Sequence, residues 1–284
     1  MKTLSVKIPE NPKKDSERIR REVLAMVDES KQRLTPGTLR KRLCENKIAD
    51  SSTLEAVIRD LVLSRDLIYT YQFGCSFIEK SYDRPVRISK RVVLKPPDTV
   101  FEPACQDIVI EILKGASFGF GDHPTTRLSI LGIEAALSVN HGILAIDNSQ
   151  ALDIGTGSGV LVMAAVLLGI PRAVGIDIDP CARTEAKMNV TLNGLGHRIA
   201  ILGTAIEDIK EPYSLITANL RYPTVRRLCA HIAGISQKQG AVVVSGITCN
   251  EVEDLLAEFT RNGFRCTWKA DEKGWAGMVF NHSG

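Results

Sequence analysis

Three alternating glycines and two carboxylates are the residues of this chain best suited to chemistry by type and spacing. They are Gly155, Gly157 and Gly159, with Asp153 before them and Asp177 after them. The glycines follow a short apolar stretch, 151–154, and Asp177 ends the next one, 173–176. Glycine lets a ligand approach the backbone where a Cβ would collide. An acid at the tip of the following strand can accept hydrogen bonds from a ribose diol. The pattern predicts an adenosine-type cofactor at the carboxyl ends of a parallel sheet.

The spacing of the glycines bears on which cofactor this is. Dinucleotide-binding loops read G-x-G-x-x-G, whereas this loop reads G-x-G-x-G with Asp153 just before it. A pyrophosphate needs an open helix N-terminus. An acid beside the loop suits a cation, and we expect Asp153 to receive the amino group of S-adenosylmethionine, directly or through water. The alternatives are a nicotinamide or flavin dinucleotide and a glycine turn that binds no ligand.

Composition restricts the class of protein. The 284 residues, 44% hydrophobic and 24% charged, suit a globular chain of two domains. The N-terminus lacks the apolar core of a signal peptide, and the longest apolar run, 160–170, is short of the roughly 20 residues that span a bilayer. Seven cysteines without a C-x-x-C pair indicate reduced thiols. We therefore expect a cytoplasmic protein with no bound metal and no membrane contact.

The N-terminal third is predicted to be a separate small domain, residues 1–95. Helical spacing covers 16–30, with Ser16 as a candidate N-cap. Thr35 and Pro36 begin a second helix that extends to about residue 45, and Ser51 or Ser52 is expected to cap a third. Residues 67–73 and 75–79 then alternate as two strands around a glycine turn. Three helices followed by a hairpin resemble a winged-helix module.

The charge of this domain leaves its role open. Residues 1–95 carry 21 Lys and Arg against 13 Asp and Glu, although acids interleave with the basic residues. One interpretation of this basic charge is that the domain binds nucleic acid, where phosphate contacts dominate affinity. The other interpretations are that the domain docks a protein partner or has a structural or dimerising role. The oligomeric state is not predicted.

The rest of the chain, residues 96–284, is predicted to be an α/β domain. Residues 80–100 look like a connector. From residue 151 onward strands and helices alternate, which predicts a doubly wound, Rossmann-like parallel sheet with right-handed crossovers. The chain closes with strands near 264–269 and 275–280, and such an antiparallel hairpin is typical of S-adenosylmethionine methyltransferases.

Five motifs in order resemble the PrmA family, methyltransferases that modify a ribosomal stalk protein on amines. They are SFGFGDHPTTR from Ser117, LDIGTGSGVL from Leu152, GIDIDPCARTEAKMNVTLNG from Gly175, ITANL from Ile216 and GWAGMVF from Gly274. The resemblance covers about residues 100–284. It implies a class I fold with a mostly parallel seven-stranded sheet, S-adenosylmethionine as the cofactor, and methyl transfer to nitrogen of a protein substrate.

The resemblance also implies particular contacts. Cofactor contacts are expected at Thr126, Gly155, Asp177 and Asn219, to which we add Ile178 beside Asp177 and Ala205 after the third strand. Asn219 is expected to orient the acceptor nitrogen, and Tyr222 to wall the substrate or simply pack. His123 is either a general base or a residue that shapes its turn. Phe118 either covers the cofactor or packs in the core.

Two departures from the family concern the acceptor. Residues 1–95 read as a winged helix where the family has a small α+β sandwich that presents the substrate, and Leu220-Arg221-Tyr222-Pro223 replaces apolar residues after Asn219. A DNA or RNA methyltransferase and a small-molecule methyltransferase therefore stand as alternatives. A transcription factor that senses S-adenosylmethionine is a third, which the intact glycine loop and carboxylates disfavour.

Overall fold

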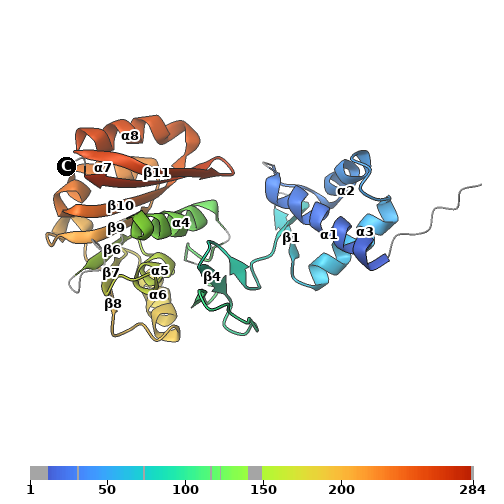
Figure 1. The fold of residues 1–284 in the computed structure, drawn as a ribbon, viewed down its shortest axis with the longest axis horizontal. Coiled ribbons are helices and arrows are strands. Elements are labelled where there is room, and N and C mark those ends of the chain that lie inside the picture. The colour runs from blue at the N-terminus through green and yellow to red at the C-terminus, as the bar shows by residue number, and fades with distance from the viewer. Residues whose placement is uncertain are drawn as a thin grey trace, which may run out of the picture. The chain divides into compact units, whose positions relative to one another are not determined.

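The computed structural model describes residues 12–30, 32–72, 74–115, 117–121, 123–139 and 149–282. The chain divides into two compact units, Met1–Arg84 and Pro85–Gly284 (Figure 1). Among the described helices, none combines the length and the apolar character needed to cross a membrane.

The N-terminal unit contains the three helices and the hairpin expected from its sequence. The helices are α1 (Pro12–Glu29), α2 (Pro36–Glu45) and α3 (Ser51–Leu63), and the strands are β1 (Leu67–Gln72) and β2 (Cys75–Lys80). Leu34, between α1 and α2, forms a β-bridge with Ile78 of β2. Apolar side chains of all three helices and both strands form one core cluster.

Local capping explains where these helices begin. Thr35 caps α2 as predicted, because its Oγ1 accepts a hydrogen bond from the Thr38 N–H at 3.1 Å. The predicted caps of the other helices are wrong. The helix α1 already begins at Pro12, so Ser16 lies inside it. Asp50, not Ser51 or Ser52, caps α3, since its Oδ1 accepts from the N–H groups of Ser52 and Thr53 at 2.9 and 3.0 Å. The Asp50 carboxylate also accepts from the hydroxyl groups of Ser52 and Thr53. These hydroxyl bonds, and to a lesser extent the backbone ones, lower the pKa of Asp50 well below its ordinary value.

Residues 80–100 are more than the predicted connector. They contain β3 (Val86–Arg87) and β4 (Val92–Lys95), and β4 pairs in parallel with β5 (Ile108–Glu111). Buried side chains of β4 and β5 join the core of the second unit. The compact unit therefore begins at residue 85, ahead of the predicted boundary at 96, because this small sheet packs into the same core as the α/β elements.

The second unit is built on a seven-stranded sheet with the order β11-β12-β10-β9-β6-β7-β8. In chain order its strands are β6 (Gln150–Ile154), β7 (Arg172–Ile176), β8 (Ile199–Leu202), β9 (Tyr213–Asn219), β10 (Ser236–Thr248), β11 (Phe264–Glu272) and β12 (Trp275–His282). The helices are α4 (Pro124–Val139), α5 (Val160–Leu167), α6 (Pro180–Leu192), α7 (Tyr222–Ile235) and α8 (Val252–Arg261). Short 3₁₀ turns lie at Ile206–Asp208 and Cys249–Glu251. The predicted alternation and the closing antiparallel hairpin are confirmed.

Side chains of the sheet alternate between two cores. Leu215 and Val243 pack with α4, α5 and α6, whereas their neighbours Ile216 and Val242 pack with α7 and α8. This period of two is the one expected of strands covered on both faces. The chain first builds β6, β7 and β8 outward and then returns to place β9 beside β6. The carboxyl ends of β6 and β9 therefore flank a topological switch point, where α/β sheets bind ligands.

Candidate functional site

The loop after β6 has its backbone donors already engaged. Gly155 and Thr156 each donate an N–H to the Ile176 carbonyl at 2.9 Å, and Gly157 donates to Asp177 Oδ2 at 3.0 Å. Ser158 donates to the Phe118 carbonyl and Gly159 to that of Thr156, at 2.9 and 2.8 Å. Five consecutive N–H groups therefore point at protein acceptors, which leaves this stretch without a nest for a pyrophosphate.

Close packing explains two of the loop glycines. A Cβ on Gly157 would lie 2.5 Å from the Phe118 carbonyl oxygen, and one on Gly155 would lie 2.7 Å from Leu220 Cδ2. Their φ angles, 54° and 71°, also lie in the left-handed region that side chains rarely adopt. The loop thus contacts the 117–121 segment on one side and the residue after β9 on the other.

Helix α6 positions the segment that carries Phe118. Glu185, Asn189 and Asn193 lie one turn apart along one helix face. Each accepts a backbone N–H from the incoming chain at 2.9 Å, from Ser117, Leu113 and Glu111 respectively. Asn189 also donates to the Ser158 carbonyl at 2.9 Å, so one helix face joins this segment to the glycine loop.

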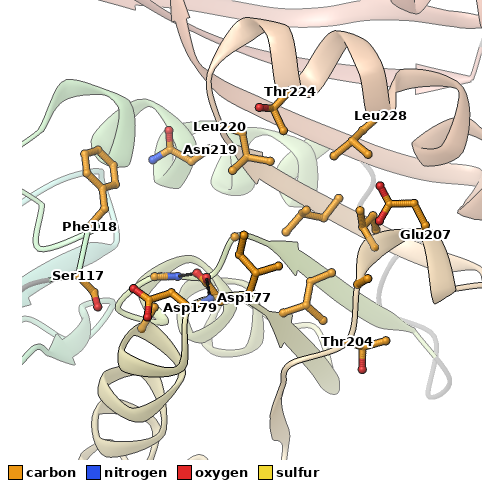
Figure 2. A pocket seen from close by; sticks show the side chains of 18 of the residues that line it. Ser117, Phe118, Asp177, Asp179, Thr204, Glu207, Asn219, Leu220, Thr224 and Leu228 are labelled. Carbon is orange, nitrogen blue, oxygen red and sulfur yellow. Dashed lines mark hydrogen bonds between the residues drawn. The ribbon is translucent and has the colours of Figure 1, made fainter.

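Asp177, at the end of β7, forms the floor of a cavity of about 490 Å³. Its Oδ2 accepts from Gly157 and its Oδ1 from the Asp179 N–H at 2.9 Å. Each carboxylate oxygen keeps a further lone pair for a ligand. Figure 2 shows Phe118 and Asn219 at one end of the cavity and Thr204 and Glu207 at the other.

Six of the predicted site residues line this cavity. They are Gly155, Gly157, Asp177, Ile178, Ala205 and Asn219. Ile178 exposes 85% of its surface and offers an apolar face to a flat ring. The Asn219 side chain makes no hydrogen bond to any residue in the described part of the chain. The structure therefore brings together residues from the ends of β6, β7 and β9 and from the segment after β8.

The other predicted residues lie outside the cavity wall. Gly159 is the N-cap of α5 and packs against Ala186. Tyr222 begins α7 and packs against the core cluster on that face of the sheet. Thr126, in α4, is fully buried, and its Oγ1 has no hydrogen-bond partner among the described residues. Asp153 is 1% exposed beneath the glycine loop.

Asp153 braces the loop from below rather than facing the cavity. Its Oδ1 accepts from Thr217 Oγ1 at 2.6 Å and its Oδ2 from Thr156 Oγ1 at 2.7 Å. Burial raises the pKa of Asp153 to about 6, although the two hydroxyl donors oppose that effect. The nearby Asp177 charge adds to the increase in this pKa. The expected direct salt bridge from Asp153 to a ligand is not available from this position.

Several lining residues were missed by the sequence analysis. Asp179 and Glu207 add carboxylates to that of Asp177, and Arg227 adds a cation. Thr224, Arg227 and Leu228 come from α7 at the spacing of one helix face, which was the available signal. Three carboxylates against one guanidinium make the lining net negative, which suits a cationic ligand better than a pyrophosphate. Within the described residues, no cluster of three or more His, Cys, Asp or Glu could hold a metal.

A mostly parallel seven-stranded sheet with a closing antiparallel hairpin, and a glycine loop and strand-end aspartate at its switch point, defines the class I methyltransferase fold. Residues 77–283 match the family described as ribosomal protein L11 methyltransferase (PrmA), and the chain belongs to this family. The first 76 residues lie outside the match.

Individual relatives agree with that assignment. The ribosomal protein L11 methyltransferase of Heliobacterium modesticaldum is 32% identical over 206 residues, 72% of this chain and 63% of the relative. That of Geobacter metallireducens is 33% identical over 196 residues, 69% of this chain and 62% of the relative. The crystal structure of a ribosomal protein L11 methylase from Lactobacillus delbrueckii subsp. bulgaricus is 27% identical, with a TM-score of 0.63, and the match covers 71% of this chain and 100% of that one. The chain thus spans less than two thirds of these two curated relatives.

Proposed function

We propose that the protein is an S-adenosylmethionine-dependent methyltransferase that acts on an amine nitrogen of a protein. The observation that carries the proposal is the floor of the cavity. There the Asp177 carboxylate is held by two backbone N–H groups and faces a space of about 490 Å³. That volume lies within the range of small-molecule sites, about 300–1,000 Å³.

The residues present fit this cofactor better than a dinucleotide. Asp177 is positioned to accept hydrogen bonds from a ribose diol, and the exposed Ile178 and the neighbouring Ala205 offer apolar contact to an adenine. The engaged N–H groups of the glycine loop and the acidic lining disfavour a pyrophosphate. Asp153 supports this site by holding Thr156 and Thr217 in place.

When bound, S-adenosylmethionine would supply a methyl group already activated on a sulfonium. The protein then has to align a nucleophile and exclude water, for which no acid–base triad is required. Asn219, at the end of β9, has a side-chain amide without a hydrogen-bond partner among the described residues, and it orients the acceptor nitrogen. Leu220 lines the cavity beside Gly155, and its side chain leaves no room for a Cβ on that glycine. An ammonium acceptor must first lose its proton, which partial desolvation in the cavity favours.

The N-terminal unit would present the acceptor. We propose that residues 1–84 are a winged-helix module that docks a protein, in place of the part of the relatives that this chain does not match. A nucleic-acid acceptor is the second candidate, because Tyr69 and Tyr71 of β1 expose 50% and 73% of their surfaces and could stack on bases. With a ribosomal acceptor the reaction would take place in the cytoplasm.

Two measurements test this proposal. Calorimetry of the full chain should show binding of S-adenosylmethionine and S-adenosylhomocysteine but not of NADH, and the opposite result would refute it. Methyl-labelled S-adenosylmethionine should then label a protein in a lysate whether or not nuclease is present. If the label disappears with nuclease, the nucleic-acid alternative is favoured. In that case binding of the nucleic acid to the protein should weaken steeply as the salt concentration rises.

A further inference from the structure

Three aromatic rings form a continuous row that begins in the cavity wall. Phe118 lines the cavity and exposes 51% of its surface. The His123 ring meets Phe118 edge-on, with centroids 5.0 Å apart and planes at 60°. On its other side His123 meets Trp275 in the same way, at 5.1 Å and 66°. We call Phe118, His123 and Trp275 the aromatic row.

The aromatic row is not part of the hydrophobic cores. Two other aromatic residues of the second unit, Phe120 and Trp268, pack against the core that includes side chains of α4, α5 and α6. None of the three rings of the aromatic row belongs to a core cluster of the described residues. Core packing therefore explains Phe120 and Trp268, and it does not explain why the rings of the row are aligned at the cavity.

An ion pair holds the segments of the row together. Arg127 of α4 donates from Nε to both carboxylate oxygens of Glu272, at 3.1 and 3.0 Å, and from Nη1 to the Gly121 carbonyl at 2.9 Å. Only 11% of the Arg127 side chain is exposed. Glu272 ends β11, and Trp275 begins β12 directly after the turn. The loop with Phe118 and the hairpin with Trp275 are thus fixed to one guanidinium, which makes the row a preformed surface.

Hydrogen bonding to Thr125 holds the His123 ring within its own turn. The Thr125 N–H donates to His123 Nδ1 at 3.3 Å, and Thr125 Oγ1 lies 2.8 Å from the same nitrogen. Since a backbone N–H can only donate, Nδ1 acts as the acceptor in the contact with Thr125. This ring nitrogen is therefore engaged by the residue two positions along the chain, within the turn itself. Of the two predicted roles for His123, the structure favours the shaping one.

We propose that the aromatic row is the platform that binds the acceptor side chain, a lysine-type amine that arrives in its protonated form. This inference rests on the proposed function. Aromatic faces attract cations within about 6 Å of their centroids and also pack on an alkyl stem. Phe118 is the ring of the row that lines the cavity, and Figure 2 shows it at the same end of the cavity as Asn219. A cationic side chain lying along the row is therefore directed toward the amide that orients its nitrogen.

The first test replaces Trp275, the ring at the end of the row opposite to the cavity wall. Trp275→Leu should raise KM for two probes, Nα-acetyl-lysine amide and ribosomal protein L11, by about 5- to 30-fold, as expected for loss of a cation–π contact of about 1–2 kcal/mol. The dissociation constant of S-adenosylmethionine should stay within about twofold, because Trp275 does not line the cavity. Trp275→Phe should restore most of the loss, and Trp268→Leu is the matched control that leaves KM unchanged.

The second test needs no variant and remains valid if Trp275→Leu does not fold. In the presence of S-adenosylhomocysteine, wild-type protein should bind the trimethyl-lysine analogue of the small probe at least about five-fold more tightly than its uncharged isostere, in which carbon replaces the quaternary nitrogen. Equal affinities, or an unchanged KM in Trp275→Leu, would overturn the platform. Failure of wild-type protein to methylate any amine would instead overturn the proposed function.

Discussion

Replacing Asp153 by asparagine should remove a pH-dependent loss of stability from the second unit. The carboxyl is fully buried, and its pKa rises from 3.8 to about 6 in the folded protein. Between these values the folded state holds a proton that the unfolded state has lost, so the free energy of unfolding falls as the pH rises through this window. Since a tenfold change in an equilibrium is worth about 1.4 kcal/mol, this one group costs about 2 to 3 kcal/mol between pH 4 and pH 7.5.

The assay is urea unfolding at several pH values, followed by tryptophan fluorescence. Both tryptophans, Trp268 and Trp275, lie in the second unit, so their emission reports on it. The stability of Asp153→Asn relative to wild type should rise by about 2 to 3 kcal/mol from pH 4 to pH 7.5. Thr217→Val removes a hydrogen bond that lowers the pKa of Asp153, so its pH window should move upward. If the stability difference between Asp153→Asn and wild type stays constant across this pH range, the raised pKa of the buried Asp153 carboxyl is refuted.

Three further substitutions test the site and the N-terminal unit. Gly157→Ala should abolish binding of S-adenosylmethionine in calorimetry, because its Cβ meets the Phe118 carbonyl oxygen at 2.5 Å, and retained affinity would contradict this loop geometry. Asn219→Ala should lower kcat at least tenfold while changing cofactor affinity by less than about threefold, since orientation acts mainly on the transition state. Equal losses in both would make Asn219 a binding residue. Thr35→Ala removes the Thr38 hydrogen bond and should cost about 1 kcal/mol in the unfolding of the N-terminal unit by circular dichroism, against no loss for a Thr35→Ser control.

Local signals were enough to predict most of the second unit. Apolar stretches at 151–154 and 173–176, each followed by glycine or an acid, place the strand ends of β6 and β7 correctly, because periodicity and turn chemistry are properties of a few consecutive residues. The same reasoning placed Asp177 at a strand end, so its position at the ligand-binding edge of the sheet could be predicted from local signals. Asn219 was predicted from the resemblance to the PrmA family, and the structure places it in the cavity lining.

Competing local signals account for the errors in the N-terminal unit. Asp50, Ser51 and Ser52 are all good caps, and the choice depends on which backbone N–H groups point at which side chain. In the second unit, β4 and β5 were missed because they pair in parallel across a gap of some dozen residues, and such pairing leaves no short-range pattern. The strand β3 was missed as well, and it is only two residues long.

The sequence by itself determined the class of fold, the glycine loop and the carboxylate at its side, because each depends on neighbouring residues and their backbone preferences. Only the tertiary structure decided that Asp153 lies beneath the loop, that Thr126 and Tyr222 lie outside the cavity wall, and that Phe118 and Trp275 share one row of rings. Those facts depend on contacts between segments far apart in the chain, whose geometry is set by the packing of the whole sheet and its helices.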